Sequence, residues 1–98
     1  MTIQTNKAGS ELTITLEGRL DTTTAPELDE VLKGSLDGVT DLIMDLEKLE
    51  YLSSAGLRVL LSAQKTMNKQ GSMVVKNVND TIMEIFEITG FSDILTIQ

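Results

Sequence analysis

The sequence has 98 residues, of which 41% are hydrophobic and 23% are charged. A chain of this length supports one hydrophobic core, so we expect a single domain over residues 1–98, and a two-domain enzyme is excluded. The 15 Asp and Glu residues outnumber the 8 Lys and Arg residues, which gives a net charge of −7. Because nucleic-acid binding depends on clustered cations, this charge favours a protein partner and argues against a nucleic acid.

Two residue types that carry much of protein chemistry are missing. The chain has no Cys and no His, which excludes a disulfide, a thiolate nucleophile, a zinc knuckle and a histidine-based triad. A serine hydrolase would lack its usual base for the same reason. We therefore expect a protein that is not an enzyme and that holds no metal and no cofactor.

The hydropathy pattern predicts no membrane contact. The stretch from Met1 to Leu20 alternates polar and apolar residues, and it contains no apolar core of signal-peptide length. No later run approaches the roughly 20 apolar residues that are needed to cross a bilayer. Together with the lack of cysteine, which fits a reducing compartment, this pattern predicts a cytoplasmic protein.

The first elements in chain order are two strands. Residues 12–16 alternate apolar and polar side chains, which is the period of a strand with one buried face. Residues 2–5, followed by a turn at 7–10, predict a short antiparallel partner at or near the edge of the sheet.

A helix follows the second strand. Thr24 and Glu27 have the spacing of a capping box, and Pro26 is tolerated in a first helical turn. The apolar side chains that recur at helical spacing are Leu28, Val31, Leu32 and Leu36. Residues 37–38, Asp-Gly, end the helix.

The middle of the chain predicts a buried strand and a second helix. Residues 42–46 are mostly apolar, as expected of an inner strand with a parallel neighbour and helices on both faces. Residues 47–52 are expected to form a loop. The second helix is marked by Leu57, Leu60, Leu61, Ala63 and Met67, and Gly71 ends it.

The C-terminal part predicts a strand at 73–75, a third helix and a last strand at 94–97. Asn79 or Asp80 caps this helix, which ends at Gly90. Its inward side chains are Ile82, Ile85 and Phe86. The resulting order is ββαβαβαβ, an α/β fold in which a small mixed β-sheet of four to five strands is flanked by helices.

One loop carries the candidate chemistry. Ser53 and Ser54 lie in the segment YLSSAGLRVLL, where the chain passes from a buried strand to the second helix. Loops at the carboxyl ends of parallel strands are common binding sites, and unpaired N–H groups of a first helical turn stabilise anions. Gly56 would let another protein approach the serines closely. A pair of serines before a helix is more often an ordinary helix cap than a site, so this interpretation stands beside the functional one.

Three segments carry a family resemblance. DLEKLEYLSSAGLRVLL, EGRLD at Glu17–Asp21 and IFEITGF at Ile85–Phe91 resemble bacterial anti-sigma factor antagonists of the STAS domain family, and the resemblance spans nearly the whole chain. It implies the STAS fold. In that family a serine kinase that doubles as the anti-sigma factor phosphorylates the serine two residues before the glycine, which points to Ser54. The family usually has Asp where this chain has Ser53, so Ser53 is the alternative acceptor.

The resemblance implies a partner switch. The unmodified protein would bind a serine-kinase anti-sigma factor with a histidine-kinase-like ATPase fold, phosphorylation would release it, and a serine phosphatase would reverse the change. Arg58, Ser62, Lys65 and Lys69 recur on the exposed side of the second helix, either as partner contacts or as an ordinary solvated face. The candidate partner-binding residues are Asp21, Thr22, Ser53, Ser54, Ala55, Gly56, Arg58, Ser62 and Lys65.

The sequence leaves two other functions open. The domain could be a STAS scaffold, or a subunit of a sensing or transport complex, that is never phosphorylated. An acidic carrier protein with a pantetheine arm on a serine is a further alternative, but carriers of that type are helical bundles. The strand patterns at 12–16 and 42–46 argue against such a carrier.

Overall fold

The computed structural model describes all 98 residues and has at its centre a four-stranded mixed sheet. Its strands, in the spatial order β1-β2-β3-β4, are β1 (Thr2–Ala8), β2 (Glu11–Leu20), β3 (Asp41–Leu52) and β4 (Ser72–Lys76). β1 pairs with β2 antiparallel, whereas the β2–β3 and β3–β4 pairs are parallel. The predicted small mixed sheet and its parallel neighbours are thereby confirmed.

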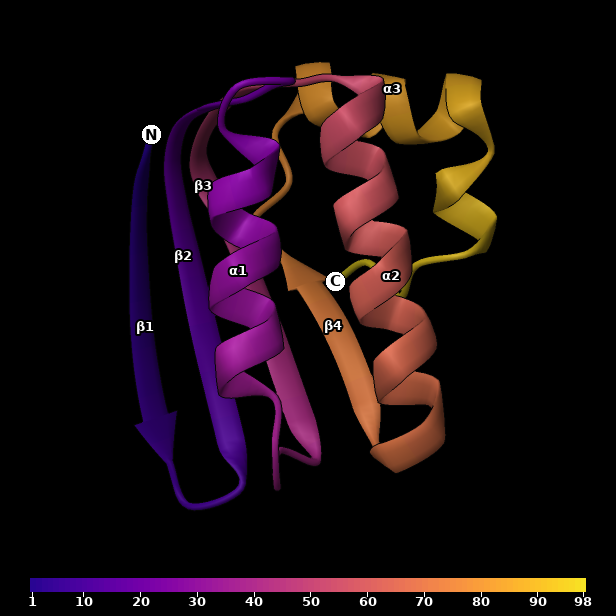
Figure 1. Cartoon of the computed structure of the whole chain (residues 1–98). Helices are drawn as coiled ribbons and strands as arrows, with labels where there is room; N and C mark the ends of the chain where they lie inside the picture. The colour runs from indigo at the N-terminus through magenta and orange to yellow at the C-terminus, as the bar shows by residue number, and fades with distance from the viewer.

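Three α-helices and one short 3₁₀ helix complete the fold. They are α1 (Ala25–Ser35), α2 (Ser54–Gln70), α3 (Asp80–Thr89) and η1 (Phe91–Asp93). α1 and α2 lie side by side over one face of the sheet (Figure 1). None of the helices is long and apolar enough to span a lipid bilayer.

The strands bury one face only. Leu12, Ile14 and Leu16 of β2 are buried and belong to the single core cluster, as the alternating pattern predicts. Ile43 and Val74, which alternate to the other face, stay only half-buried. The expectation that the inner strand is covered by helices on both faces is therefore wrong: helices α1 and α2 share one face (Figure 1).

β3 is longer than its sequence pattern predicts. The expected loop at residues 47–52 is part of the strand, and Leu46, Leu49 and Leu52 are all buried. Register shifts between Thr15 and Glu17 and between Gly18 and Arg19 place one extra β3 residue at each point. These bulges change the spacing of the buried leucines from two to three, which hides the strand period.

The C-terminal segment forms no regular strand. Where a strand at 94–97 was predicted, an isolated parallel bridge joins Ile97 to Val75 of β4. The Val75 N–H donates to the Thr96 carbonyl at 2.8 Å, and the Gln98 N–H donates to the Val75 carbonyl at 2.9 Å. The last β of the predicted order is thus wrong, because only one residue pair adds to the free edge of β4, beside which the chain ends (Figure 1).

The starts of α1 and α3 differ, because a side chain caps α3 and none caps α1. The predicted capping box at Thr24 is wrong: this residue has helical φ and ψ, and its hydroxyl accepts from the Asp21 N–H and donates to the Arg19 carbonyl, each at 2.8 Å. Asn79 does cap α3, accepting from the Ile82 N–H at 2.9 Å. Gly90 ends α3 at φ 81°, a left-handed conformation that favours glycine.

Candidate functional site

The serine loop and the β2–α1 loop leave the sheet at the same edge. Leu20 and Leu52 are register partners at the ends of parallel strands, so the residues that follow them emerge side by side. The Ser53 N–H donates to the Leu20 carbonyl at 2.9 Å, which continues the pairing one residue beyond the strand. Asp21 and Ser53 are far apart in the sequence, but they therefore lie side by side on one surface of the protein.

Ser53 is the N-cap of α2. Its backbone is extended, with φ −95° and ψ 174°, and its Oγ accepts from the Gly56 N–H at 3.4 Å. The Ser53 carbonyl accepts the first bond of the helix, from the Leu57 N–H at 3.0 Å. The capping interpretation of the serine pair therefore holds for Ser53, whose half-buried side chain is engaged in the helix start.

Ser54 is in a different position from its neighbour. It is the first residue of α2, it is exposed, and its hydroxyl takes part in none of the side-chain hydrogen bonds of the chain. The first turn of a helix directs N–H groups and a partial positive charge toward an anion. The Ser54 hydroxyl is thus accessible to a phosphoryl donor, and a phosphate ester at this position would be electrostatically favoured.

Gly56 points into the protein and not toward a partner. A Cβ at this position would lie 2.7 Å from both Leu20 Cγ and Leu52 Cδ1, closer than real Cβ atoms approach. The interpretation that Gly56 opens the serines to another protein is therefore wrong. Its missing side chain lets the first turn of α2 pack on the ends of β2 and β3, and this packing fixes where Ser54 lies.

Asp21 organises the β2–α1 loop. Its Oδ1 accepts from the Thr23 hydroxyl at 2.8 Å and from the N–H groups of Thr23 and Thr24 at 3.0 and 3.1 Å. The Thr23 hydroxyl bond, followed by these backbone bonds, holds the pKa of the Asp21 carboxyl below its ordinary value despite partial burial. Asp21 thus turns back into its own loop, while Thr22 beside it is exposed.

Four of the predicted residues line one surface hollow. Thr22, Ala55, Arg58 and Ser62 face it together with Ala25, Pro26, Asp29 and Val59. The other predicted residues do not line it: Asp21, Ser53, Ser54, Gly56 and Lys65. Sequence reasoning missed Pro26 and Asp29, which are three residues apart in α1 and therefore lie on one side of that helix, a spacing that is visible in the sequence.

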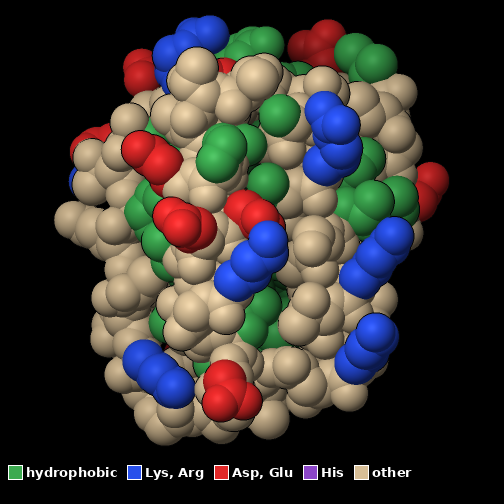
Figure 2. Space-filling model, in the orientation of Figure 1, with side chains coloured by type: hydrophobic (Ala, Val, Ile, Leu, Met, Phe, Trp, Pro, Cys, Tyr) green, Lys and Arg blue, Asp and Glu red, His purple; other side chains and the backbone are tan.

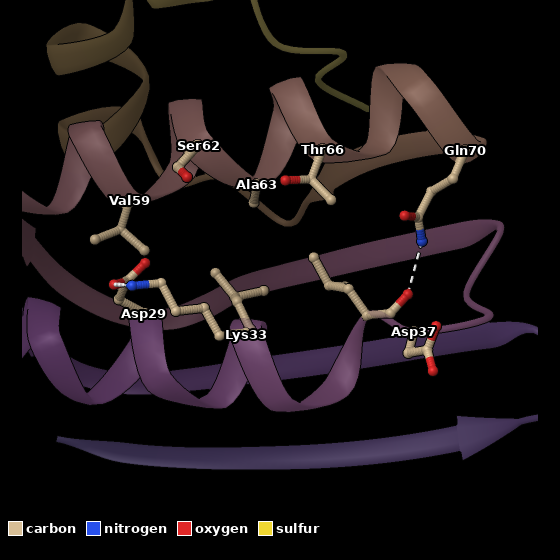
Figure 3. A pocket seen from close by; sticks show the side chains of 10 residues that line it. Asp29, Lys33, Asp37, Val59, Ser62, Ala63, Thr66 and Gln70 are labelled. Atoms are coloured by element: carbon tan, nitrogen blue, oxygen red, sulfur yellow. Dashed lines mark hydrogen bonds and ion pairs between the residues drawn. The ribbon is translucent and has the colours of Figure 1, made fainter.

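A second hollow continues along the groove between α1 and α2 (Figure 3). Asp29 and Lys33 face it as an ion pair of 2.8 Å, and Gln70 Nε2 donates to the Leu36 and Val39 carbonyls at 2.6 Å. Its volume is about 240 Å³, below the roughly 300 Å³ at which small-molecule pockets begin. This hollow is therefore a shallow seam between the two helices.

The charge on α2 is of one sign. The helix contains Arg58, Lys65 and Lys69 and no acidic residue, and all three basic side chains are exposed. Figure 2 shows basic side chains along α2, whereas acidic side chains lie nearer α1. On a protein of net charge −7, this basic stripe, defined here as Arg58, Lys65 and Lys69, is a local exception.

Arg19 and Tyr51 form a pair that sequence reasoning missed. They are register partners near the ends of β2 and β3, and the guanidinium carbon lies 4.3 Å from the centre of the tyrosine ring. Arg19 Nε is also 4.0 Å from Asp21 Oδ2. The pair depends on the β3 bulges for its register, so no local sequence pattern would have predicted it.

Comparison with known proteins assigns the family. The sequence matches the STAS domain over residues 2–98. The anti-sigma-B factor antagonist of Staphylococcus aureus is 32% identical over 100 residues, covering 100% of this chain and 93% of that protein. The chain belongs to the STAS domain family, and the predicted resemblance to bacterial anti-sigma factor antagonists is confirmed.

Solved structures share the fold. An anti-sigma factor antagonist from Mycobacterium paratuberculosis has a TM-score of 0.88 at 22% identity, over 98% of this chain and 83% of that one. SpoIIAA in its unphosphorylated form has a TM-score of 0.79 at 19% identity, over 99% of this chain and 87% of that one. Its phosphorylated form from Bacillus gives 0.77 at 19% identity, over 99% and 91%. At these identities the likeness shows the fold alone.

Proposed function

We propose that this protein is an anti-sigma factor antagonist that works as a partner switch. In the unmodified state it would bind a serine-kinase anti-sigma factor with a histidine-kinase-like ATPase fold, and phosphorylation of Ser54 would release it. A serine phosphatase would restore the binding form. The names of its relatives support the antagonist role, and the existence of a phosphorylated form of SpoIIAA supports the switch.

The single observation that carries the proposal is the state of Ser54. Of the two adjacent serines, Ser53 is half-buried and caps α2, whereas Ser54 is exposed and its hydroxyl is unbonded. In the proposed reaction the Ser54 oxygen bonds to the γ-phosphorus of ATP, ADP leaves, and the hydroxyl proton is released. The phosphatase step adds water across the ester and returns the hydroxyl and inorganic phosphate. The protein is here a substrate and a binding partner and not a catalyst.

The proposed contact surface is the edge where the two loops meet, continued along α2. Its residues are Asp21, Thr22, Ser53, Ser54, Ala55, Arg58, Ser62 and Lys65, and Gly56 supports them from beneath. A phosphate adds about −1.5 to −2 charges that an interface must desolvate or match. If the phosphate costs the interface about 2.7 kcal/mol, binding weakens about a hundredfold, and a single modification then works as the switch.

The fold is expected to stay the same in both states. The start of α2 favours an anion, so the phosphorylated chain has no reason to unfold there. We place the exchange in the cytoplasm, where bacterial transcription takes place, with the whole chain acting as one STAS domain.

The experiment is phosphorylation by an anti-sigma factor kinase of the same genome with ATP, followed by intact mass. One phosphate is expected on the parent chain and on Ser53→Ala, and none on Ser54→Ala. The site assignment is wrong if Ser53→Ala abolishes the modification and Ser54→Ala keeps it. If no chain gains phosphate with any such kinase, the switch is wrong and the unphosphorylated STAS scaffold is the better description.

A further inference from the structure

Arg58 lies one helical turn after Ser54 on the same face of α2. Residues separated by four positions in a helix have Cβ atoms about 5–6 Å apart, and long side chains lean toward the helix N-terminus. Arg58 is exposed and shares one hollow with Ala55 of the first turn and Ser62 of the next. Its guanidinium is therefore within reach of an anion on the Ser54 oxygen.

The charges around Arg58 leave it available for such an anion. The ion pairs of the chain join Arg19 to Asp21 and Lys33 to Asp29, and Arg58 takes part in neither. Asp29 of α1, the one carboxylate that lines the same hollow, is held by Lys33 at 2.8 Å. The Asp21 carboxylate in the β2–α1 loop accepts several bonds from Thr23 and Thr24.

We propose that Arg58 is the intramolecular counter-ion of a phosphate on Ser54, and that phosphorylation thereby withdraws Arg58 from the partner-facing surface. This inference rests on the proposed function, whose modification site it uses. An acidic group four residues before a basic one is the favourable order in a helix. The planar guanidinium can also donate two parallel hydrogen bonds to a phosphate, which an ammonium group cannot do in the same geometry.

The pairing explains how a single phosphate could change the surface that the partner meets. In the unmodified chain the first turns of α2 carry the positive charge of Arg58, and the basic stripe continues to Lys69. The partner surface that fits this stripe is acidic. A phosphate of about −2 reverses the local charge of +1 and occupies the guanidinium. The acidic partner surface then meets a negative group where it had met a cation.

The first test needs neither the kinase nor the partner. Phosphoserine is introduced at position 54 by genetic encoding, and the phosphate is titrated by ³¹P NMR in the parent chain and in Arg58→Gln. The proposal predicts a phosphate pKa that is lower in the parent by about 0.3 unit or more. Arg58→Lys is expected to give an intermediate pKa.

The matched control is Lys69→Gln, which removes the same charge from the same helix. Its position is fifteen residues from Ser54, about 22 Å along the axis, beyond the screening length of about 8–10 Å. This variant is expected to leave the phosphate pKa unchanged. Equal pKa values in the parent and Arg58→Gln would overturn the pairing, and so would equal shifts in Arg58→Gln and Lys69→Gln.

The second test measures withdrawal from the interface by a double-mutant cycle with the anti-sigma factor. Arg58→Gln is expected to weaken binding of the unmodified chain about tenfold and to have little further effect on the chain with phosphoserine at 54. Equal losses in both forms would show that phosphorylation leaves Arg58 in place. If phosphoserine at 54 leaves the affinity for the anti-sigma factor unchanged while the phosphate pKa still differs between the parent and Arg58→Gln, the proposed function is wrong. The pairing of Arg58 with the phosphate would still stand.

Discussion

The backbone N–H of Ser53 lies 2.9 Å from the carbonyl oxygen of Leu20, and this bond links the two loops that form the candidate site. Leu20 ends β2 and Leu52 ends β3, so the bond extends the parallel ladder into the loop. The position of Ser54 is therefore set by the sheet and not by a flexible connection. A rigid support of this kind allows a single covalent change to alter binding without refolding.

The stability of a Gly56 variant measures how tightly α2 packs on the sheet. Gly56→Ala places a methyl group 2.7 Å from side-chain atoms of Leu20 and Leu52, and overpacking of this kind costs about 1–3 kcal/mol. Urea denaturation should show a loss of this size. A stability equal to that of the parent would mean that the first turn of α2 is not held against the strand ends.

Gly34→Ala is the matched control for that substitution. Gly34 also lies in a helix, but a Cβ there meets nothing within 4 Å. Alanine is favoured over glycine in a helix by about 0.5–1 kcal/mol, so this variant is expected to gain stability while Gly56→Ala loses it. The same direction for both would contradict the packing argument.

Ser53 is expected to stabilise the protein by capping α2. Ser53→Ala removes the oxygen that accepts from the Gly56 N–H at 3.4 Å, and the loss of a cap costs about 0.5–1 kcal/mol. Ser53→Asp restores the acceptor and adds a charge that the helix start favours, so it should be at least as stable as the parent. Thermal unfolding of the three chains measures this. Equal midpoints for Ser53→Ala and Ser53→Asp would argue against the cap.

Asn79 joins α3 to the sheet by two bonds. Its Oδ1 caps α3 through the Ile82 N–H, and its Nδ2 donates to the Leu49 carbonyl of β3, each at 2.9 Å. Asn79→Ala should cost about 2 kcal/mol in chemical denaturation, since both bonds are lost. Asn79→Ser keeps a cap acceptor and loses the donor to Leu49, so its stability should lie between those of the parent and Asn79→Ala. A loss for Asn79→Ala no larger than that for Asn79→Ser would show that the cap contributes nothing.

Asp21 should make stability depend on pH in the acid range. Its pKa is lowered in the folded chain from the ordinary value of 3.8, chiefly by the Thr23 hydroxyl, so the unfolded chain takes up the proton first. The stabilisation by the ionised carboxyl is complete well above pH 3.8 and is lost as pH falls through the lowered folded pKa. The stability difference between the parent and Asp21→Asn should therefore shrink between pH 6 and pH 2.

Carboxyl NMR titration gives the second readout of the same prediction. The Asp21 pKa should lie below 3.8 in the parent and should rise in Thr23→Val, because this variant lacks the hydroxyl that lowers the pKa most. A value at or above 3.8 in the parent, or no change in Thr23→Val, would be at odds with the loop geometry.

The sequence pattern predicts most of the scaffold because the burial is periodic. The alternation in residues 12–16, the apolar stripe of α2 and the Asn79 cap all appear where local rules place them. Local rules fail where two strands interact. The β3 bulges, which give a spacing of three to Leu46, Leu49 and Leu52, depend on pairing with β2.

Sequence reasoning names the candidate residues of the serine loop but not the contacts that hold them in place. The family resemblance points to Ser54, and the structure places this residue at the exposed start of α2. The family resemblance could not indicate that Gly56 faces Leu20, that Thr24 bonds to Arg19, or that Arg19 stacks on Tyr51. The Gly56–Leu20 and Arg19–Tyr51 contacts join segments whose approach is set by the register of β2 and β3, whereas the Thr24–Arg19 bond depends on the conformation of the β2–α1 loop.

The most direct measurement is the affinity of the anti-sigma factor for the chain with serine and with phosphoserine at position 54, by calorimetry under identical salt. The account predicts that phosphoserine at 54 weakens binding at least about a hundredfold, while circular dichroism shows the same fold. Equal affinity for the two chains would contradict the central claim that Ser54 is the switch.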